Sequence, residues 1–366
     1  MQFIDLQKQY KKYQEEIDDA IRSVMSHGRY IMGPEVEKLE NKLAKYVDVK
    51  FCIGTANGTD SLQIALMALD IGPGDEVITV PFTWISTAEV IKLVGADPVF
   101  VDIDPETYTM NIEQMEEAIT PRTKAIIPVS LFGQMPDYER INKIAEKYHL
   151  PVIEDGAQSF GATQRGKKSC GATTIGSTSF FPAKPFGCYG DGGALFTNDD
   201  ALAEKMQAIR LHGGKKRHHH THIGMNSRLD TIQAAVLLAK FKYFPMEVEA
   251  RKRIGKRYSL LLKDYCCIPK IEDGNTSVYA QYTIRIENRG ELIHALKEKG
   301  IPSAVYYPKC LHEQEVFLSS KTAPKNFPEA EKAAGSVLSL PMHPYLEESE
   351  QDEVAKAVQE SLSVLA

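Results

Sequence analysis

The chain lacks the features typical of membrane, secreted and nucleic-acid-binding proteins. Its 366 residues contain no apolar run near the ~20 residues that span a bilayer, and residues 1–7 lack the basic stretch and apolar core of a signal peptide. The six cysteines form no CxxC pair and no disulfide-framework spacing, which predicts reduced thiols in a cytoplasmic protein. With 43 basic and 49 acidic residues the net charge is −6, which disfavours nucleic acid as a partner.

What the sequence does contain, before residue 200, is an alternation of short β-rich runs with helical stretches. The expected strands are 51–54, 77–80, 98–101, 125–130, 151–154, 177–181 and 194–197. The expected helices are 8–27, which Gly28 should end, 35–46, 59–69, 86–94 and 138–148. This alternation predicts an α/β fold with a mainly parallel sheet covered by helices.

The pattern changes in the last third of the chain. Residues 227–230, Ser-Arg-Leu-Asp, have the form of a capping box that opens a long helix, which Pro245 should break or kink. Beyond it the pattern predicts strands at 278–286 and 304–307 and helices at 291–299 and 351–365. We therefore expect a large α/β domain over residues 1–240 and a smaller α+β domain over 241–366.

One lysine lies in an unusual loop, between two prolines and just before four glycines in seven residues. This lysine is Lys184, and Pro185 disfavours helical geometry at the position before it. A lysine in an extended, aromatic-rich loop can be partly desolvated, which lowers its pKa and frees the amine as a nucleophile. Taken alone, Lys184 is better interpreted as a surface lysine whose stem covers apolar neighbours, so the rest of the sequence has to decide.

Polar turns also follow other expected strands, where α/β sheets bind ligands. Gly58 and Thr59 open a helix and could bind a phosphate, although Asn-Gly turns and threonine N-caps are common. Trp84, the only tryptophan, could stack on a flat ligand or pack in the core. Asp155 ends a buried strand and needs a cation or donors, or it caps the next helix. Ser179 is a further candidate phosphate donor.

Together these parts are what a pyridoxal 5′-phosphate site requires. Lys184 supplies an amine for a Schiff base, Asp155 a carboxylate for the pyridinium nitrogen, and the turn at Gly58 a phosphate cup. Trp84 supplies an aromatic lid for the cofactor ring. This combination predicts transamination, in which the freed lysine moves the proton between the amino acid and the cofactor, whose pyridoxamine form carries the amino group.

The order and spacing of the motifs resemble those of the DegT/DnrJ/EryC1/StrS family of nucleotide-sugar aminotransferases. The matching stretches are 56–59, 154–155 with Gln158, 179–184, 190–194 and 224–230. The resemblance implies an aspartate-aminotransferase-like fold of type I, with a mainly parallel seven-stranded sheet in the large domain. It also implies aminotransfer rather than dehydration, because the dehydratases of the family carry histidine in place of Lys184.

The resemblance assigns roles to individual residues. It implies that Lys184 forms the Schiff base and acts as general acid and base, and that Asp155 pairs with the pyridine nitrogen. Gln158 is placed near the 3-hydroxyl of the ring and Trp84 at the ring-stacking position. The phosphate ligands implied are Gly58, Thr59, Ser179 and an Asn226 from a second subunit. This last assignment implies a homodimer with composite sites.

Within the family, residues 179–193, 226–231, 277–283 and 339–345 are similar to those of aminotransferases acting on UDP-2-acetamido-2-deoxy-3-oxo-D-glucuronate. This likeness implies L-glutamate as amino donor and a 3-amino UDP-sugar product for bacterial surface polysaccharide such as O-antigen. Other keto sugars remain open: UDP-3-keto-N-acetylglucosamine or a 4-keto sugar. A non-catalytic regulator on the same fold is a further alternative. A nicotinamide dehydrogenase is disfavoured, because no strand leads into G-x-G-x-x-G.

The sequence also contains candidates for the nucleotide-sugar end. They are Arg29, Arg228, Tyr306, Tyr307 and His312, with Tyr306 standing where the family usually has histidine. Residues 215–222 form a basic loop that includes Arg217 and four histidines. Adjacent histidines in a loop rarely present a fixed tetrahedral site, so no metal is expected. We hypothesise that the loop attracts the negative charges of the substrate; a solvated loop without specific contacts is the alternative.

Overall fold

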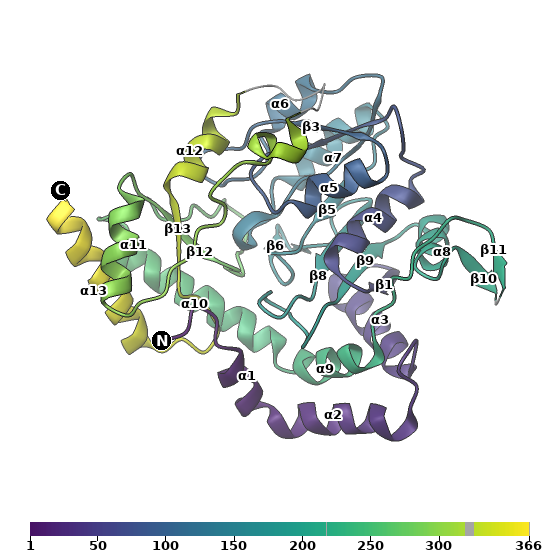
Figure 1. Ribbon diagram of the computed structural model, residues 1–366, viewed down its shortest axis with the longest axis horizontal. Helices are drawn as coiled ribbons and strands as arrows, with labels where there is room; N and C mark the ends of the chain where they lie inside the picture. The colour runs from purple at the N-terminus through teal and green to yellow at the C-terminus, as the bar shows by residue number, and fades with distance from the viewer. Residues whose placement is uncertain (217, 319–325, 366) are drawn as a thin grey trace.

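The computed structural model describes residues 1–216, 218–318 and 326–365 (Figure 1). The helices before residue 240 are α1 (Leu6–Lys12), α2 (Gln14–His27), α3 (Pro34–Val47), α4 (Gly58–Ala68), α5 (Ser86–Leu93), α6 (Ile112–Glu117), η1 (Leu131–Gly133), α7 (Tyr138–Lys147), α8 (Asp200–Ile209) and α9 (Thr231–Phe241). Those after it are α10 (Phe244–Leu262), α11 (Arg289–Glu298), η2 (Leu311–Glu313), η3 (Glu315–Phe317), α12 (Pro328–Ser336) and α13 (Glu348–Leu365). None of the described helices has the length and hydropathy needed to cross a bilayer.

The strands before residue 240 are β1 (Phe51–Thr55), β2 (Glu76–Thr79), β3 (Asp97–Phe100), β4 (Thr123–Ile126), β5 (Ile153–Asp155), β6 (Thr163–Gln164), β7 (Lys167–Lys168), β8 (Ile175–Ser179), β9 (Gly193–Thr197), β10 (Gly214–Lys216) and β11 (His219–His220). The strands after it are β12 (Tyr282–Arg285) and β13 (Val337–Leu340), which pair antiparallel. The α/β alternation predicted from the sequence is confirmed.

The strands of the large domain form two ladders that lie side by side. One is four-stranded, in the order β1-β9-β8-β5, and the other is three-stranded, in the order β3-β2-β4. Parallel bridges between Ile126 and Val152 and between Val129 and Asp155 join them. Pro128 and Pro151 lack the N–H groups that a continuous ladder needs. One continuous sheet of seven strands therefore stays a prediction.

Strand direction differs across this arrangement. The pairs β5–β8, β2–β3 and β2–β4 are parallel, whereas β9 runs antiparallel to both β1 and β8. The strands are buried almost throughout, because α4 and α8 cover the faces of β1, β8 and β9. This burial fits the nearly continuous apolar runs seen in the sequence, since strands covered on both faces do not alternate.

Two predicted helices differ from the structure. The expected helix 8–27 is divided at Tyr13, whose buried ring stacks on Tyr243 at 3.8 Å between centroids; Gly28 ends α2 in a left-handed conformation with φ 70°, as predicted. The capping box at 227–230 is wrong. Helix α9 begins at Thr231, and the side chain of Asp230 at the N-cap position makes no capping bond. The Ser227 hydroxyl, which the capping box would use, instead accepts a bond from the Ala56 N–H at 3.3 Å.

The chain breaks between α9 and α10, as Pro245 predicted. The proline lies in the first turn of α10, where the backbone N–H groups have no helical partner, so its missing N–H costs no helical hydrogen bond. In place of the predicted strand 304–307 there is a single bridge between Ala304 and Ser339. The expected domain boundary at residue 240 falls at this break, and the division into domains 1–240 and 241–366 stays a prediction.

The N-terminal segment packs on the C-terminal part of the chain. The first residues run alongside the C-terminal part (Figure 1), where the Phe3 carbonyl accepts from the Met342 N–H at 3.1 Å. The Gln9 side chain donates to the Glu247 carboxylate at 3.0 Å. The N-terminal segment thus packs on elements that follow residue 241.

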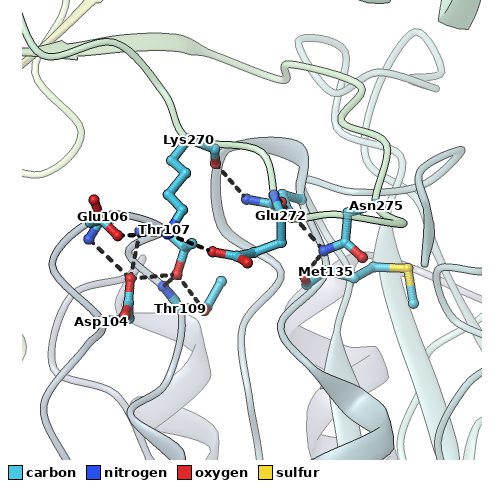
Figure 2. Close-up of polar contacts among 9 residues, drawn as sticks. Asp104, Glu106, Thr107, Thr109, Met135, Lys270, Glu272 and Asn275 are labelled. Atoms are coloured by element: carbon cyan, nitrogen blue, oxygen red, sulfur yellow. Dashed lines mark hydrogen bonds and ion pairs between the residues drawn. The ribbon is translucent and has the colours of Figure 1, made fainter. Parts of the chain in front are cut away.

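A second connection joins the loops around Asp104 and Met135 to the segment 270–275 (Figure 2). The Lys270 amine donates to the Glu106 carboxylate at 2.6 Å, and the Asn275 amide donates to the Met135 carbonyl at 3.0 Å. The Gln134 side chain bonds both the Lys270 carbonyl and the Glu272 N–H, at 2.9 and 2.7 Å. Contacts between residues far apart in the sequence therefore hold the C-terminal part against the sheet.

Candidate active site

The Lys184 loop connects β8 to β9 as a tight, non-helical hairpin, as the flanking prolines predicted. The Phe180 N–H donates to the Gly192 carbonyl at 2.7 Å, and the Cys188 N–H donates to the Phe180 carbonyl at 2.8 Å. Gly187 has no room for a side chain, because a Cβ there would lie 2.5 Å from the Pro182 carbonyl oxygen. These bonds close the hairpin on itself, with Lys184 in the loop between Phe180 and Cys188.

Lys184 faces the carboxylate of Asp155. Burial lowers the pKa of Lys184, and the charge of Asp155 acts in the opposite direction. Within the described chain, the Lys184 amine donates no hydrogen bond. A desolvated lysine near a carboxylate fits the nucleophile that the sequence predicted, because its amine has a free lone pair once it is deprotonated.

Asp155 lies at the carboxyl end of β5 and is almost fully buried. Its carboxylate accepts from the Thr87 hydroxyl at 2.7 Å and from the Ala157 N–H at 3.2 Å. Burial raises the pKa of Asp155, while these two donors and Lys184 oppose the shift. No ion pair to Asp155 forms among the residues that the structure describes, so the carboxylate is suited to a cation brought by a ligand.

The start of α4 has the form of an anion cup. Asn57 caps the helix by accepting from the Asp60 N–H at 2.8 Å, which leaves the N–H groups of Gly58 and Thr59 without a partner in the described chain. A Cβ on Gly58 would lie 2.7 Å from the Cβ of Ser179, so only glycine lets β8 approach this helix end. Free amides at a helix N-terminus favour a phosphate.

An aromatic and amide cluster lies beside Asp155. The Gln158 side chain donates to the Tyr307 hydroxyl at 3.1 Å and accepts from the Phe132 N–H at 2.8 Å. The Trp84 ring lies 6.1 Å from that of Tyr307 and is 58% exposed, so it is not a core residue. Burial raises the pKa of Tyr307, and the Asp155 charge adds to this shift. The structure thus brings Trp84, Gln158 and Tyr307 together around Asp155.

Other predicted residues lie outside this cluster. Arg29 follows α2 at the surface, where its N–H donates to the His27 ring at 3.0 Å. Asn226 is exposed and pairs through its backbone with Leu211; neither its side chain nor that of Arg228 has a hydrogen bond or ion pair within the described residues. Their roles toward a substrate or a second subunit stay predictions.

Two further candidates for the nucleotide-sugar end pack against protein. His312 is buried, with Nε2 3.1 Å from the Glu331 carboxylate and its ring against Phe327. Tyr306 lies 6.2 Å from the ring of Phe3. In the described chain, His312 bonds to a residue of α12 and not to the residues around Lys184 and Asp155. Its role toward a substrate therefore stays a prediction.

The histidine-rich loop is a short hairpin, β10–β11, that projects beyond α8 (Figure 1). The His220 ring lies 2.9 Å from the His212 carbonyl. No group of metal-ligating side chains occurs anywhere in the described chain. Arg217 lies outside the described residues, and the attraction of substrate charge by this loop stays a hypothesis.

Sequence reasoning missed two residues behind Asp155. Thr87, 68 positions away, carried no signal of its contact. Glu154 is fully buried on the other face of β5 and accepts from Ser130 and Ser169 hydroxyls at 2.9 and 2.7 Å and from the Cys170 N–H at 2.8 Å. Burial raises the pKa of Glu154 to about 7. Because side chains alternate along a strand, the sequence could have shown that Glu154 and Asp155 lie on opposite faces of β5.

An α/β fold with a partly buried lysine, a buried carboxylate, an anion cup and an exposed ring around the ends of β5 and β8 has the arrangement of a pyridoxal-phosphate enzyme. The profile of the DegT/DnrJ/EryC1/StrS aminotransferase family matches residues 11–359. The chain belongs to this family.

Curated relatives cover nearly the whole chain. It is 54% identical to the UDP-2-acetamido-2-deoxy-3-oxo-D-glucuronate aminotransferase of Pseudomonas aeruginosa, over 95% of this chain and 96% of the relative. It is 48% identical to the pleiotropic regulatory protein of Geobacillus stearothermophilus, over 98% and 97%. Identity to the UDP-N-acetyl-3-dehydro-alpha-D-glucosamine 3-aminotransferase of Acidithiobacillus ferrooxidans is 41%, over 98% and 97%.

Solved structures agree with the fold. A DegT/DnrJ/EryC1/StrS aminotransferase from Brucella abortus superposes with a TM-score of 0.96 at 48% identity, over 98% of this chain and 99% of that one. NtdA from Bacillus subtilis, crystallised with bound cofactor PMP, superposes with a TM-score of 0.91 at 32% identity, over 99% and 83%. The predicted type of fold is confirmed.

Proposed function

We propose that the protein is a cytoplasmic, pyridoxal-phosphate-dependent nucleotide-sugar aminotransferase. It transfers the amino group of L-glutamate to the 3-keto carbon of a UDP-2-acetamido-2-deoxy-3-oxo-D-glucuronate-type sugar, for bacterial surface polysaccharide such as O-antigen. The observation that carries the proposal is the partly buried Lys184 side chain near the buried Asp155 carboxylate, whose charge acts on the Lys184 pKa. The 54% identity to the Pseudomonas aeruginosa enzyme supports this choice of sugar.

The residues fit the cofactor. Asp155 is a buried anion without a contacting cation in the described chain, and the Gly58 position is a cradle that a Cβ would fill. When bound, pyridoxal phosphate supplies an electron sink for breaking the Cα–H bond of an amino acid. Gly58, Thr59 and Ser179 would hold its phosphate, Trp84 would cover its ring, and Gln158 would donate to its 3-hydroxyl oxygen.

The two charged residues divide the proton chemistry. When the cofactor is bound, the Asp155 carboxylate would accept a hydrogen bond from its protonated ring nitrogen and would keep that nitrogen charged. The Lys184 Nζ, whose pKa is lowered by burial, would take a proton from the amino donor and later return one to the acceptor. Thr87 holds the Asp155 carboxylate in place through its hydroxyl.

A homodimer completes the proposed site. Several large apolar side chains are exposed, among them Tyr30 44%, Ile31 49%, Phe181 51% and Ile223 87%. Where such side chains form one contiguous patch, they mark a protein interface. Asn226, three residues after Ile223 and without a side-chain partner in the described chain, would reach the phosphate of the second subunit's cofactor.

Two alternatives each have an observation in their favour. The 41% identity to the Acidithiobacillus enzyme keeps UDP-3-keto-N-acetylglucosamine as an acceptor. The 48% identity to a pleiotropic regulatory protein keeps a regulatory role as the second candidate. The retained Lys184 and Asp155 favour the enzyme.

Absorbance spectroscopy tests the proposal. Purified protein loaded with pyridoxal phosphate is expected to show the visible band of lysine-bound cofactor, and glutamate should bleach it. Lys184→Ala should abolish the band and the bleaching, whereas exposed Lys242→Ala should leave both unchanged. Failure of the wild-type protein to take up cofactor would rule the function out. Single-turnover assays with 3-keto and 4-keto UDP-sugars, with and without the carboxylate, then decide the acceptor.

A further inference from the structure

Helix α9 holds the Lys184 loop through two side chains on one face. Gln233 and Lys240 are seven residues apart on α9, so both point toward the loop. The Gln233 side chain accepts from the Tyr189 N–H at 2.8 Å and donates to the Tyr189 carbonyl at 3.2 Å. Both backbone groups of Tyr189 are therefore satisfied by one amide on α9.

Lys240 makes the second contact. It is only 3% exposed, its amine donates to the Gly187 carbonyl, and the amine lies 5.1 Å from the centre of the Tyr189 ring. Burial lowers the pKa of Lys240 to about 8, with Glu247 and Arg251 acting in opposite directions. Burying an ammonium group is costly unless it is paired and hydrogen-bonded. Its one hydrogen bond in the described chain goes to the loop that carries Lys184.

Gly187 transmits this contact to Lys184. The Gly187 backbone packs against the Pro182 carbonyl so closely that a Cβ would lie 2.5 Å from that oxygen. The Lys184 N–H donates to the Phe181 carbonyl at 2.9 Å within the same turn. A displacement of Gly187 therefore moves the residues on which the Lys184 backbone rests.

We propose that Lys240 is a positioning residue for Lys184. Its amine fixes the Gly187 carbonyl, and the fixed turn 181–187 holds the Lys184 amine toward Asp155. This inference rests on the proposed role of Lys184 as the cofactor lysine. Gln233 acts in a similar way: its bonds to Tyr189 hold the other side of the same hairpin.

The loop contains its own reporter. Cys188 is fully buried, and its thiol bonds the Phe180 and Gly190 carbonyls at 3.1 and 3.2 Å. In the cofactor-free protein, Lys240→Met should raise the alkylation rate of Cys188 and the amide exchange of residues 181–192 by about tenfold, because a buried carbonyl loses its donor. Lys242→Met, at an exposed lysine two positions on, should leave both rates within a factor of about two.

Measurements on the cofactor-loaded enzyme distinguish a positioning role of Lys240 from a role in packing alone. Lys240→Met should lower kcat by about tenfold, with a smaller change in the KM for glutamate, and should shift the pH midpoint of the cofactor's visible band. Lys240→Arg, which keeps the charge and the donor, should recover part of the loss.

Unchanged Cys188 protection in Lys240→Met would overturn the proposal. So would a loosened loop with kcat and the spectroscopic midpoint at wild-type values, because Lys240 would then only pack. If Lys240→Met does not fold, Gln233→Leu is measured in the same way and is held to the same outcomes. Wild-type protein that binds no cofactor would refute the proposed function alone, since the Cys188 measurement needs none.

Discussion

At the scale of single residues, Thr87 adjusts the ionisation of Asp155. Its hydroxyl bond to the carboxylate, at 2.7 Å, opposes the effect of burial on the Asp155 pKa. Thr87→Val keeps the shape and removes this bond, so the pKa should rise further. Because the ionised carboxylate is the form that holds a protonated ring nitrogen, the acid limb of the kcat/KM profile should move to higher pH.

The expected loss of kcat/KM for Thr87→Val is about tenfold near neutral pH. Thr109→Val removes another buried hydroxyl, one bonded to Thr107, and should leave the profile in place. A profile that does not move in Thr87→Val would contradict the role given to this hydroxyl.

Glu154 makes a prediction about stability. Its pKa is raised from 4.5 to about 7 by burial, so the folded state binds a proton that the unfolded state releases. Its contribution to the free energy of unfolding should therefore fall as pH rises through this window, by about 3 kcal/mol at most. Urea unfolding of cofactor-free wild type and Glu154→Gln at about pH 5 and about pH 7 measures this contribution. Parallel pH dependences in the two proteins would contradict it.

Lys184 and Asp155 could be identified from the sequence because local features mark them: a proline after the lysine and a buried strand before the aspartate. Thr87 and Lys240 could not. Each acts through one contact across a long stretch of chain, 68 residues for Thr87 and 53 for Lys240. A pattern along the sequence contains no signal of such a contact, because the folding of the intervening elements creates it.

At the scale of elements, the approach of β8 to the start of α4 depends on one missing side chain. Gly58→Ala puts a Cβ 2.7 Å from the Cβ of Ser179, and neither backbone can retreat without moving a helix or a strand. We expect pyridoxal-phosphate affinity to fall by about tenfold to a hundredfold, the range that overpacking of this kind costs. Fluorescence titration of the cofactor measures the change.

Gly290→Ala is the matched control. Gly290 is also in the first turn of a helix, α11, but nothing lies within 4 Å of the added Cβ. The cofactor affinity of this variant should equal that of wild type. Equal affinities for Gly58→Ala and Gly290→Ala would show that the cup at α4 does not hold the cofactor.

The helices and strands were predictable where local chemistry decides them. Apolar runs located the strands, and Gly28 and Pro245 marked helix ends. The break at Tyr13 was not predictable, because the ring that stacks on Tyr13 belongs to Tyr243. The antiparallel direction of β9 also has no local signal, since the hairpin that reverses the chain has to close first.

At the scale of the whole molecule, the single chain leaves part of the proposed site unfilled. Lys184, Asp155, Gly58 and Trp84 come together within one chain, whereas the Asn226 side chain is exposed and makes no hydrogen bond or ion pair in the described residues. If Asn226 serves the other subunit, the defects of Lys184→Ala and Asn226→Ala belong to different sites of a mixed dimer. Each variant alone should then have low activity at limiting cofactor, for different reasons.

Mixing the two variants decides between the arrangements. After dissociation and reassociation of equal amounts, half of the dimers should be mixed, and each mixed dimer should carry one intact site and one doubly altered site. Activity should therefore return to about a quarter of the wild-type value. If Asn226 acted within its own chain, every site would keep one defect and no activity would return. Mixing Lys184→Ala with Asp155→Asn is the control, because both residues belong to one chain's site and no recovery is expected.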